Sequence, residues 1–308
     1  MFFPKKALGL ELSNERARFV LLSGKKDTLC LNAFSEASFP VDTLKFSLRE
    51  EGILNRDVFV STIRKLHHSL LPHVKQVSLS IPDSTGRVML LDVETRFKSK
   101  AEGIDIIRWK LKKSFPFDIN EAQLDYQVIR EKETGEVSLL VSLIAKPVVR
   151  QIEDLLAEAG LEPNRIDFTT FNLYSLFSQR LDLAENSLLV AFHESAVGIL
   201  IFHEGKLEFY RAKEVSGGIR EANRIYREIN NSFLVFKEKT PGRLPNEAFC
   251  VYSGDDAEVF CALIEEATGL DPVLLDAERV ITRSKSSDIN QKTLRHFAAA
   301  LGAATRNL

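Results

Sequence analysis

The stretch VAFHESAVGILIF, residues 190–202, consists of two apolar runs on either side of the polar turn HESA. A similar stretch, GLELSNERARFVLL, occupies residues 9–22 around the turn SNER. Short apolar or alternating runs bounded by polar turns are typical of a β-hairpin. A third run follows in both places, so the sequence predicts one three-stranded unit that occurs twice. The expected strands are residues 7–12, 17–23 and 28–34, and then residues 187–192, 197–202 and 207–212.

Helical periodicity follows both copies of this unit. Apolar residues recur every three or four positions in residues 57–71, 147–160 and 216–238, which predicts helices that each bury one face. In the last of these segments the apolar stripe runs from Ile219 to Phe236.

We therefore predict an α/β protein with two lobes of one design. The first lobe comprises residues 1–73 and 146–186, and a small α/β subdomain, residues 74–145, is inserted into it. The second lobe comprises residues 187–308, and its last helix, residues 288–308, is expected as an element that can return to the first lobe.

The composition is that of an ordinary globular protein, with 44% hydrophobic and 27% charged residues. The 41 Lys and Arg residues balance 43 Asp and Glu residues, which excludes the basic excess of a nucleic-acid-binding protein. No apolar run approaches the roughly 18 residues of a membrane-spanning helix, and the start MFFPKK is too short for a signal peptide. We expect a cytoplasmic protein without a metal site, and we expect Cys30, Cys250 and Cys261 to be buried free thiols.

One block is more specific. The segment IRWKLKKSFPFDINEAQLDYQVI, residues 107–129, resembles a conserved block of the type IV pilus assembly protein PilM family. Residues 137–177 resemble that family's next block, YSGDDAE at 252–258 takes the place of its glycine-rich loop, and AAALGAA at 298–304 resembles its closing segment. The resemblance extends over residues 7–305. It implies a duplicated two-lobed fold of the actin/Hsp70-like (ribonuclease H-like) type.

The resemblance also implies a nucleotide site between the lobes, where two hairpin turns hold the phosphates and a third loop holds the adenosine. Phosphate binding needs close backbone approach and therefore glycine, and an Asp on each first strand orders Mg²⁺ and water. Here Glu11 and Ser13 stand at the first Asp and Gly positions, and Ala191 and His193 stand at the second. The adenosine loop has aspartates where glycines are expected. We therefore predict no enzymatic activity and no cofactor, with weak binding of ATP and Mg²⁺ as the alternative. The residues of this degenerate site are Glu11, Ser13, Asn14, His193, Glu194, Ser195, Gly217, Gly218, Ser253 and Gly254.

The partner that the resemblance implies is the N-terminal cytoplasmic peptide of a PilN-type inner-membrane protein. In the family this peptide lies in a groove between the first lobe and the inserted subdomain, which would place the protein at the inner membrane. We predict a binding surface that combines aromatic anchors with cations, while a solvated helix face or a contact with anionic lipid stays open. Its residues are Trp109, Lys110, Lys112, Lys113, Phe115, Pro116 and Phe117. The alternatives in function are an active actin-like ATPase and a GspL-like component of type II secretion.

Overall fold

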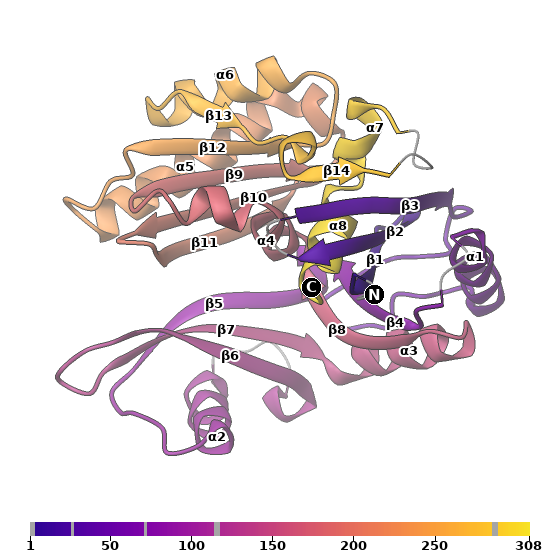
Figure 1. Cartoon of the computed structure of the whole chain (residues 1–308). Helices are drawn as coiled ribbons and strands as arrows, with labels where there is room; N and C mark the ends of the chain where they lie inside the picture. Colours follow the sequence, from indigo (N-terminus) through magenta and orange to yellow (C-terminus); the bar gives the residue numbers. More distant parts are fainter. Residues whose placement is uncertain (1–3, 26–27, 71–72, 114–117, 285–288) are drawn as a thin grey trace.

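The computed structural model describes residues 4–25, 28–70, 73–113, 118–284 and 289–308. Its strands form two large sheets, one in each lobe, and a smaller sheet in the inserted subdomain (Figure 1). The predicted Phe115, Pro116 and Phe117 lie outside the described residues.

The two large sheets share one strand order. The first sheet has the order β14-β3-β2-β1-β4-β8 and the second has the order β11-β10-β9-β12-β13. In each, two hairpins form an antiparallel three-stranded unit, and the first strand of that unit pairs in parallel with a later strand. The predicted duplication is therefore confirmed. The strands are β1 (Lys6–Leu12), β2 (Arg16–Lys25), β3 (Thr28–Ser38), β4 (Gln76–Ile81), β8 (Glu162–Phe168), β14 (Ile281–Arg283), β9 (Ser187–His193), β10 (Ala196–His203), β11 (Lys206–Glu214), β12 (Glu247–Tyr252) and β13 (Pro272–Leu274).

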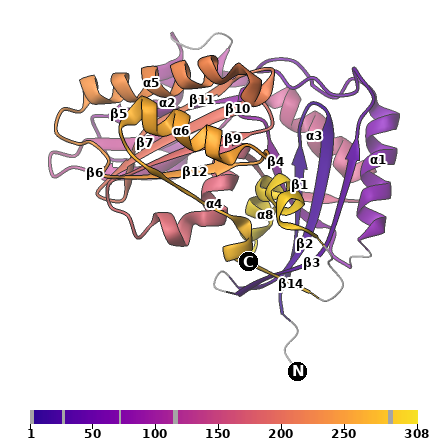
Figure 2. The same cartoon turned by 90° about the horizontal axis from the view of Figure 1, so that it is seen from above.

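Helices cover both faces of each large sheet. The helices α1 (Arg56–Ser69) and α3 (Lys146–Glu158) pack on the outer face of the first sheet, while α5 (Ala222–Lys239) and α6 (Ala257–Thr268) pack on the outer face of the second. Between the two sheets lie α4 (Thr169–Leu181) and α8 (Ala298–Thr305), preceded by the short α7 (Gln291–His296) (Figure 2).

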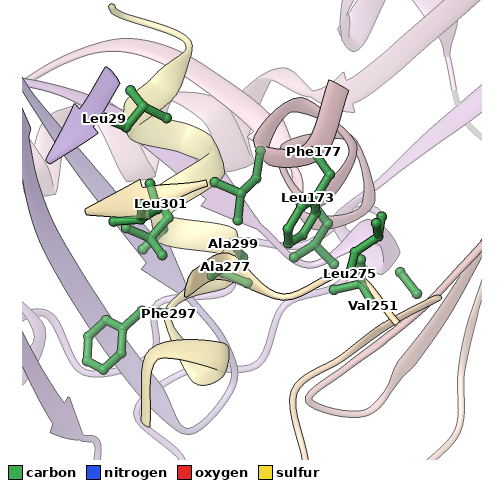
Figure 3. Packing of buried hydrophobic residues seen from close by; sticks show 14 of the residues in the cluster. Leu29, Leu173, Phe177, Val251, Leu275, Ala277, Phe297, Ala299 and Leu301 are labelled. Atoms are coloured by element: carbon green, nitrogen blue, oxygen red, sulfur yellow. The ribbon is translucent and has the colours of Figure 1, made fainter. Parts of the chain in front are cut away.

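The core between the lobes contains residues of both sheets. Leu29 from the first lobe, Val251 from the second and Leu173 from α4 belong to one buried cluster (Figure 3). In this core α8 packs very closely against α4. A Cβ on Gly302 of α8 would stand 1.9 Å from the carbonyl oxygen of Asn172 in α4, so this contact requires glycine. The last helix thus ties the lobes together, and it contacts β1 of the first lobe.

The inserted subdomain is a three-stranded sheet with the order β5-β7-β6, covered on one face by α2. Its elements are β5 (Gly86–Val93), α2 (Lys100–Leu111), β6 (Ala122–Glu131) and β7 (Val137–Ala145). The strand β4 lies within the range predicted for this unit, but it pairs between β1 and β8 in the first sheet. Five of its six residues are buried, as in a central strand covered on both faces. The inserted unit therefore begins at β5 rather than at residue 74.

The second lobe was predicted to comprise residues 187–308. The strand β14 lies in this range but pairs in parallel with β3, so it belongs to the first sheet. The three cysteines are free, although only Cys250 is fully buried and Cys30 and Cys261 are half-buried. Among the described residues, no helix is both long and apolar enough to cross a membrane.

Candidate functional site

The ends of the two first strands meet where the lobes face each other. Glu11 lies near the end of β1 and His193 is the last residue of β9, and their side chains contact at 2.5 Å between Oε1 and Nε2. Both side chains are at most 3% exposed. The structure thus brings together two of the predicted site residues that are far apart in the sequence.

A third buried residue, Arg18, completes this contact. The register of the first hairpin places Arg18 of β2 directly opposite Glu11 of β1. Its Nη1 donates to Glu11 Oε1 at 3.3 Å and to Glu194 Oε1 at 2.5 Å, while its Nε donates to Glu36 Oε2 at 2.5 Å. We call these five residues (Glu11, Arg18, Glu36, His193 and Glu194) the interlobe cluster. It joins carboxylates of both lobes through one guanidinium group.

Opposite charges control the protonation of the interlobe cluster. Burial alone would lower the pKa of Arg18 and of His193, but the neighbouring carboxylates outweigh it and raise both. Burial would raise the pKa of Glu194, yet the charge of Arg18 lowers it. The arginine is therefore a fixed cation that favours the ionised form of Glu194. Glu11 Oε2 and His193 Nδ1 are buried without a hydrogen-bond partner in the described structure.

A divalent cation does not fit this cluster. Glu11, His193 and Glu194 each offer a ligand atom, and these atoms lie within 4.8 Å of one another. However, Arg18 already bonds to both carboxylates, so a metal ion would have to stand beside a fixed positive charge. In the described structure, one oxygen of each of these two carboxylates, Oε1 of Glu11 and Oε1 of Glu194, is therefore already bonded to a cation.

Other residues predicted for the nucleotide site support the turns themselves. Ser13 Oγ accepts a hydrogen bond from Arg16 N at 3.1 Å, and Asn14 Oδ1 accepts one from Phe46 N at 2.8 Å. The carbonyl oxygen of Ser195 accepts a hydrogen bond from Val215 N at 2.6 Å.

In the third loop, Ser253 Oγ accepts a hydrogen bond from Glu194 N at 3.4 Å, so this loop joins the interlobe cluster. Gly254 follows it and packs closely against the Tyr252 ring. Gly217 and Gly218 both have positive φ and open the 3₁₀ turn that precedes α5. A positive φ explains this glycine pair without a phosphate.

A groove of about 770 Å³ lies elsewhere, where the inserted subdomain meets both lobes. Its lining includes residues of β6, β8 and β11. Each of these three is the outermost strand of its sheet (Figure 1). Polar and apolar residues both line it. The apolar ones are Val88, Val128, Ile129, Leu140, Ile144, Val149, Pro163, Ile166, Phe168, Phe171, Leu200, Phe202 and Leu207. These residues suit apolar side chains of a ligand.

Charged residues stand among these apolar ones. Arg306, just after α8, pairs with Asp167 of β8 at 2.6 Å. Burial raises the pKa of Asp167, and the charge of Arg306 opposes that rise. Asp125 and Arg165 add one charge of each sign to the lining. A ligand would therefore meet apolar side chains together with charges of both signs.

Near the groove, an ion pair and several hydrogen bonds attach the second lobe to the rest of the protein. Arg130 of β6 pairs with Glu208 of β11 at 3.0 Å. Tyr210 of β11 donates a hydrogen bond to Asp83 Oδ1 at 2.8 Å, and Thr170 donates to Oδ2 from its amide and its hydroxyl. Burial raises the pKa of Asp83 to about 6, although these hydrogen bonds oppose the rise. These contacts attach β11 of the second lobe to β6 of the inserted subdomain and to the segment just before β5.

The predicted partner-binding residues that the structure describes lie on the other side of the inserted sheet. Trp109 on α2 is 79% exposed, Lys110 Nζ donates to the carbonyl oxygen of Asp92, and Lys112 and Lys113 are exposed. Strand alternation separates the two faces. On β7, the residues that pack under α2 are Leu139, Val141 and Leu143, and those that line the groove are Leu140, Ser142 and Ile144.

Comparison with known proteins gives a consistent result. The family model for type IV pilus assembly protein PilM matches residues 9–248. Among curated proteins, no sequence matches this chain.

Solved structures show the fold. A chain of a PilM–PilN type IV pilus biogenesis complex aligns over 97% of this chain and 98% of its own, with a TM-score of 0.84 and 18% identity. A Bacteroides thetaiotaomicron protein of actin-like ATPase fold aligns over 88% and 91%, with a TM-score of 0.52 and 15% identity. The cytoplasmic domain of EpsL, from the type II secretion system of Vibrio cholerae, aligns over 80% and 82%, with a TM-score of 0.51 and 11% identity. The expected actin-like fold is confirmed.

Proposed function

This chain belongs to the PilM family of type IV pilus assembly proteins, and from that premise we propose that it is a scaffold that binds the cytoplasmic N-terminal peptide of a PilN-type inner-membrane protein. The observation that carries the proposal is the groove between β6, β8 and β11, where apolar side chains lie among charged ones. A structural relative was solved as a PilM–PilN complex, which supports the choice of partner. Binding of such a partner would hold the protein at the inner membrane.

The groove favours an extended peptide. Outermost strands present unpaired backbone N–H and C=O groups, and a peptide can add to them as a further strand. Main-chain hydrogen bonds to β6 or β8 would then provide affinity, and apolar side chains of the peptide would pack against Ile144 and Phe168. The charges of Asp125 and Arg165 would fix its direction.

A charge placed in the groove should prevent binding. We expect Leu140→Arg to weaken binding of the partner's N-terminal peptide at least tenfold, because the side chain is half-buried in the lining and would leave an unpaired cation there. Calorimetry with the synthetic peptide measures the effect. Leu234→Arg, at a position 45% exposed on α5, is the matched control and should leave the affinity unchanged. Equal affinities of Leu140→Arg and the parent protein would place the peptide elsewhere.

The basic end of α2 is a second surface that we propose for recruitment by the same partner. Charge reversal of Lys110, Lys112 and Lys113 to Glu should leave the fold intact, because these side chains are exposed. We expect the variant to be recruited less to inner-membrane vesicles that carry the partner. Recruitment and partner pull-down equal to those of the parent would exclude any part for this face, including a contact with anionic lipid.

We also propose that the protein does not hydrolyse ATP. The support is the interlobe cluster, in which Arg18 occupies the carboxylates that a Mg²⁺–phosphate group would need. Titration of the purified protein with Mg-ATP in a calorimeter should give no dissociation constant in the low micromolar range. Binding in that range, or phosphate release above a buffer blank, would favour the alternative of an active ATPase.

A further inference from the structure

Two of the three cysteines approach each other in the second lobe. Cys250 lies in β12 and Cys261 in α6, and their Sγ atoms are 3.2 Å apart. We propose that Cys250 and Cys261 form a reversible oxidation site, in which a hydroperoxide converts the two thiols into an intramolecular disulfide.

The geometry requires little movement. A disulfide bond is about 2.05 Å long, so the two sulfur atoms need to approach by roughly 1 Å. Cys250 is held in a strand that pairs with β9 on one side and β13 on the other, so its backbone is fixed. Cys261 stands in a helix that packs on the same sheet, and its side chain points toward the strand. Rotation of the Cys261 side chain can supply the approach.

The two thiols differ in reactivity. Cys250 is fully buried, whereas Cys261 is half-buried and is the more exposed of the two. The hydrogen bond from Cys250 lowers the pKa of Cys261, although burial and the nearby Asp271 and Glu258 oppose the shift. That same hydrogen bond and burial raise the pKa of Cys250. A thiol with a lowered pKa at the more exposed position, within 3.2 Å of a buried second thiol, is the arrangement of a reactive cysteine beside a resolving one.

The reaction balances with hydrogen peroxide as the oxidant. The Cys261 thiolate attacks one peroxide oxygen, the O–O bond breaks, and the products are a sulfenic acid on Cys261 and hydroxide. The Cys250 sulfur then attacks the Cys261 sulfur, the S–O bond breaks, and the thiol proton leaves with the oxygen as water. In total the two thiols lose two electrons and the peroxide is reduced to two molecules of water.

The disulfide would act on the loop that carries Ser253. Residues 253–256 connect β12 to α6, and Ser253 of this loop accepts the hydrogen bond from Glu194 of the interlobe cluster. A disulfide across the two flanking elements closes this short segment into a ring. The oxidised protein should therefore unfold at a higher temperature than the reduced protein.

The test is to treat the full chain with hydrogen peroxide, to titrate the remaining thiols, and to identify linked peptides by mass spectrometry. We expect the titratable thiols to fall from three to one, a Cys250–Cys261 linked peptide to appear, and a reductant to restore all three thiols. Cys30→Ser is the matched control, since Cys30 lies in the first lobe, and this variant should still form the linked peptide.

Cys250→Ser separates the two steps of the reaction. This variant should stop at a sulfenic acid on Cys261, which a dimedone label would detect. Intact thiols after treatment, oxidation of Cys30 ahead of Cys261, or bonds only between separate chains would each overturn the proposal.

Discussion

Replacing Arg18 with methionine should lower the free energy of unfolding by about 3–5 kcal/mol, which is the usual cost of removing one partner from a buried ion pair. The arginine contacts Glu11 and Glu194 from the two lobes, and its side chain is 3% exposed. Methionine keeps much of the buried stem but leaves the carboxylates without their cation. Because one of these carboxylates belongs to each lobe, the loss should also loosen the contact between the lobes.

Urea denaturation measures this change, and two further variants interpret it. Arg16→Met is the matched control, because Arg16 is 42% exposed and its pair with Glu36 is 3.4 Å long, so we expect a loss below about 1 kcal/mol. Adding Glu11→Gln and Glu194→Gln to the Arg18 variant should recover part of the stability, because the unpaired charges are then removed. A loss below about 1 kcal/mol for Arg18→Met would show that the buried cluster does not join the lobes.

Apolar runs bounded by polar turns predicted the hairpins well. The strands expected at 7–12 and 17–23 correspond to β1 and β2, and nearly all of their residues are buried, as in strands covered on both faces. The helices followed from apolar spacing, because each buries one face. The assignment of β4 was less successful, since a strand buried on both faces carries no signal for the sheet to which it belongs.

The candidate sites, too, could be predicted only where they depend on local structure. A hairpin with the turn SNER places residue 18 opposite Glu11, so the Arg18–Glu11 pair can be predicted from the first hairpin alone. The contact between Arg18 and Glu194 cannot be predicted in this way, because it depends on how the two lobes pack against each other. The groove could not be predicted from the sequence. Its borders are three outermost strands from separate parts of the chain, and only their assembly places β6, β8 and β11 around one cavity.

Replacing Phe236 with alanine should lower the free energy of unfolding by about 3–5 kcal/mol, the range measured when a buried phenylalanine is truncated. The apolar stripe on the helix at 216–238 predicted this residue to be buried, and it is 1% exposed in α5. Its ring meets Phe209 of β11 edge-on, with the ring centroids 6.0 Å apart. The truncation therefore removes both apolar contact with the sheet and an aromatic pair.

A neighbouring position on the same helix separates burial from helix propensity. Leu234 is 45% exposed, so Leu234→Ala removes a large apolar side chain from α5 without opening a cavity. We expect Leu234→Ala to change the free energy of unfolding by less than about 1 kcal/mol, since alanine also favours the helix. Denaturant midpoints of both variants with an unchanged slope would attribute the difference to packing. If both variants lost the same amount, α5 would not bury the face that its stripe indicates, and the outer layer of the second lobe would have to be revised.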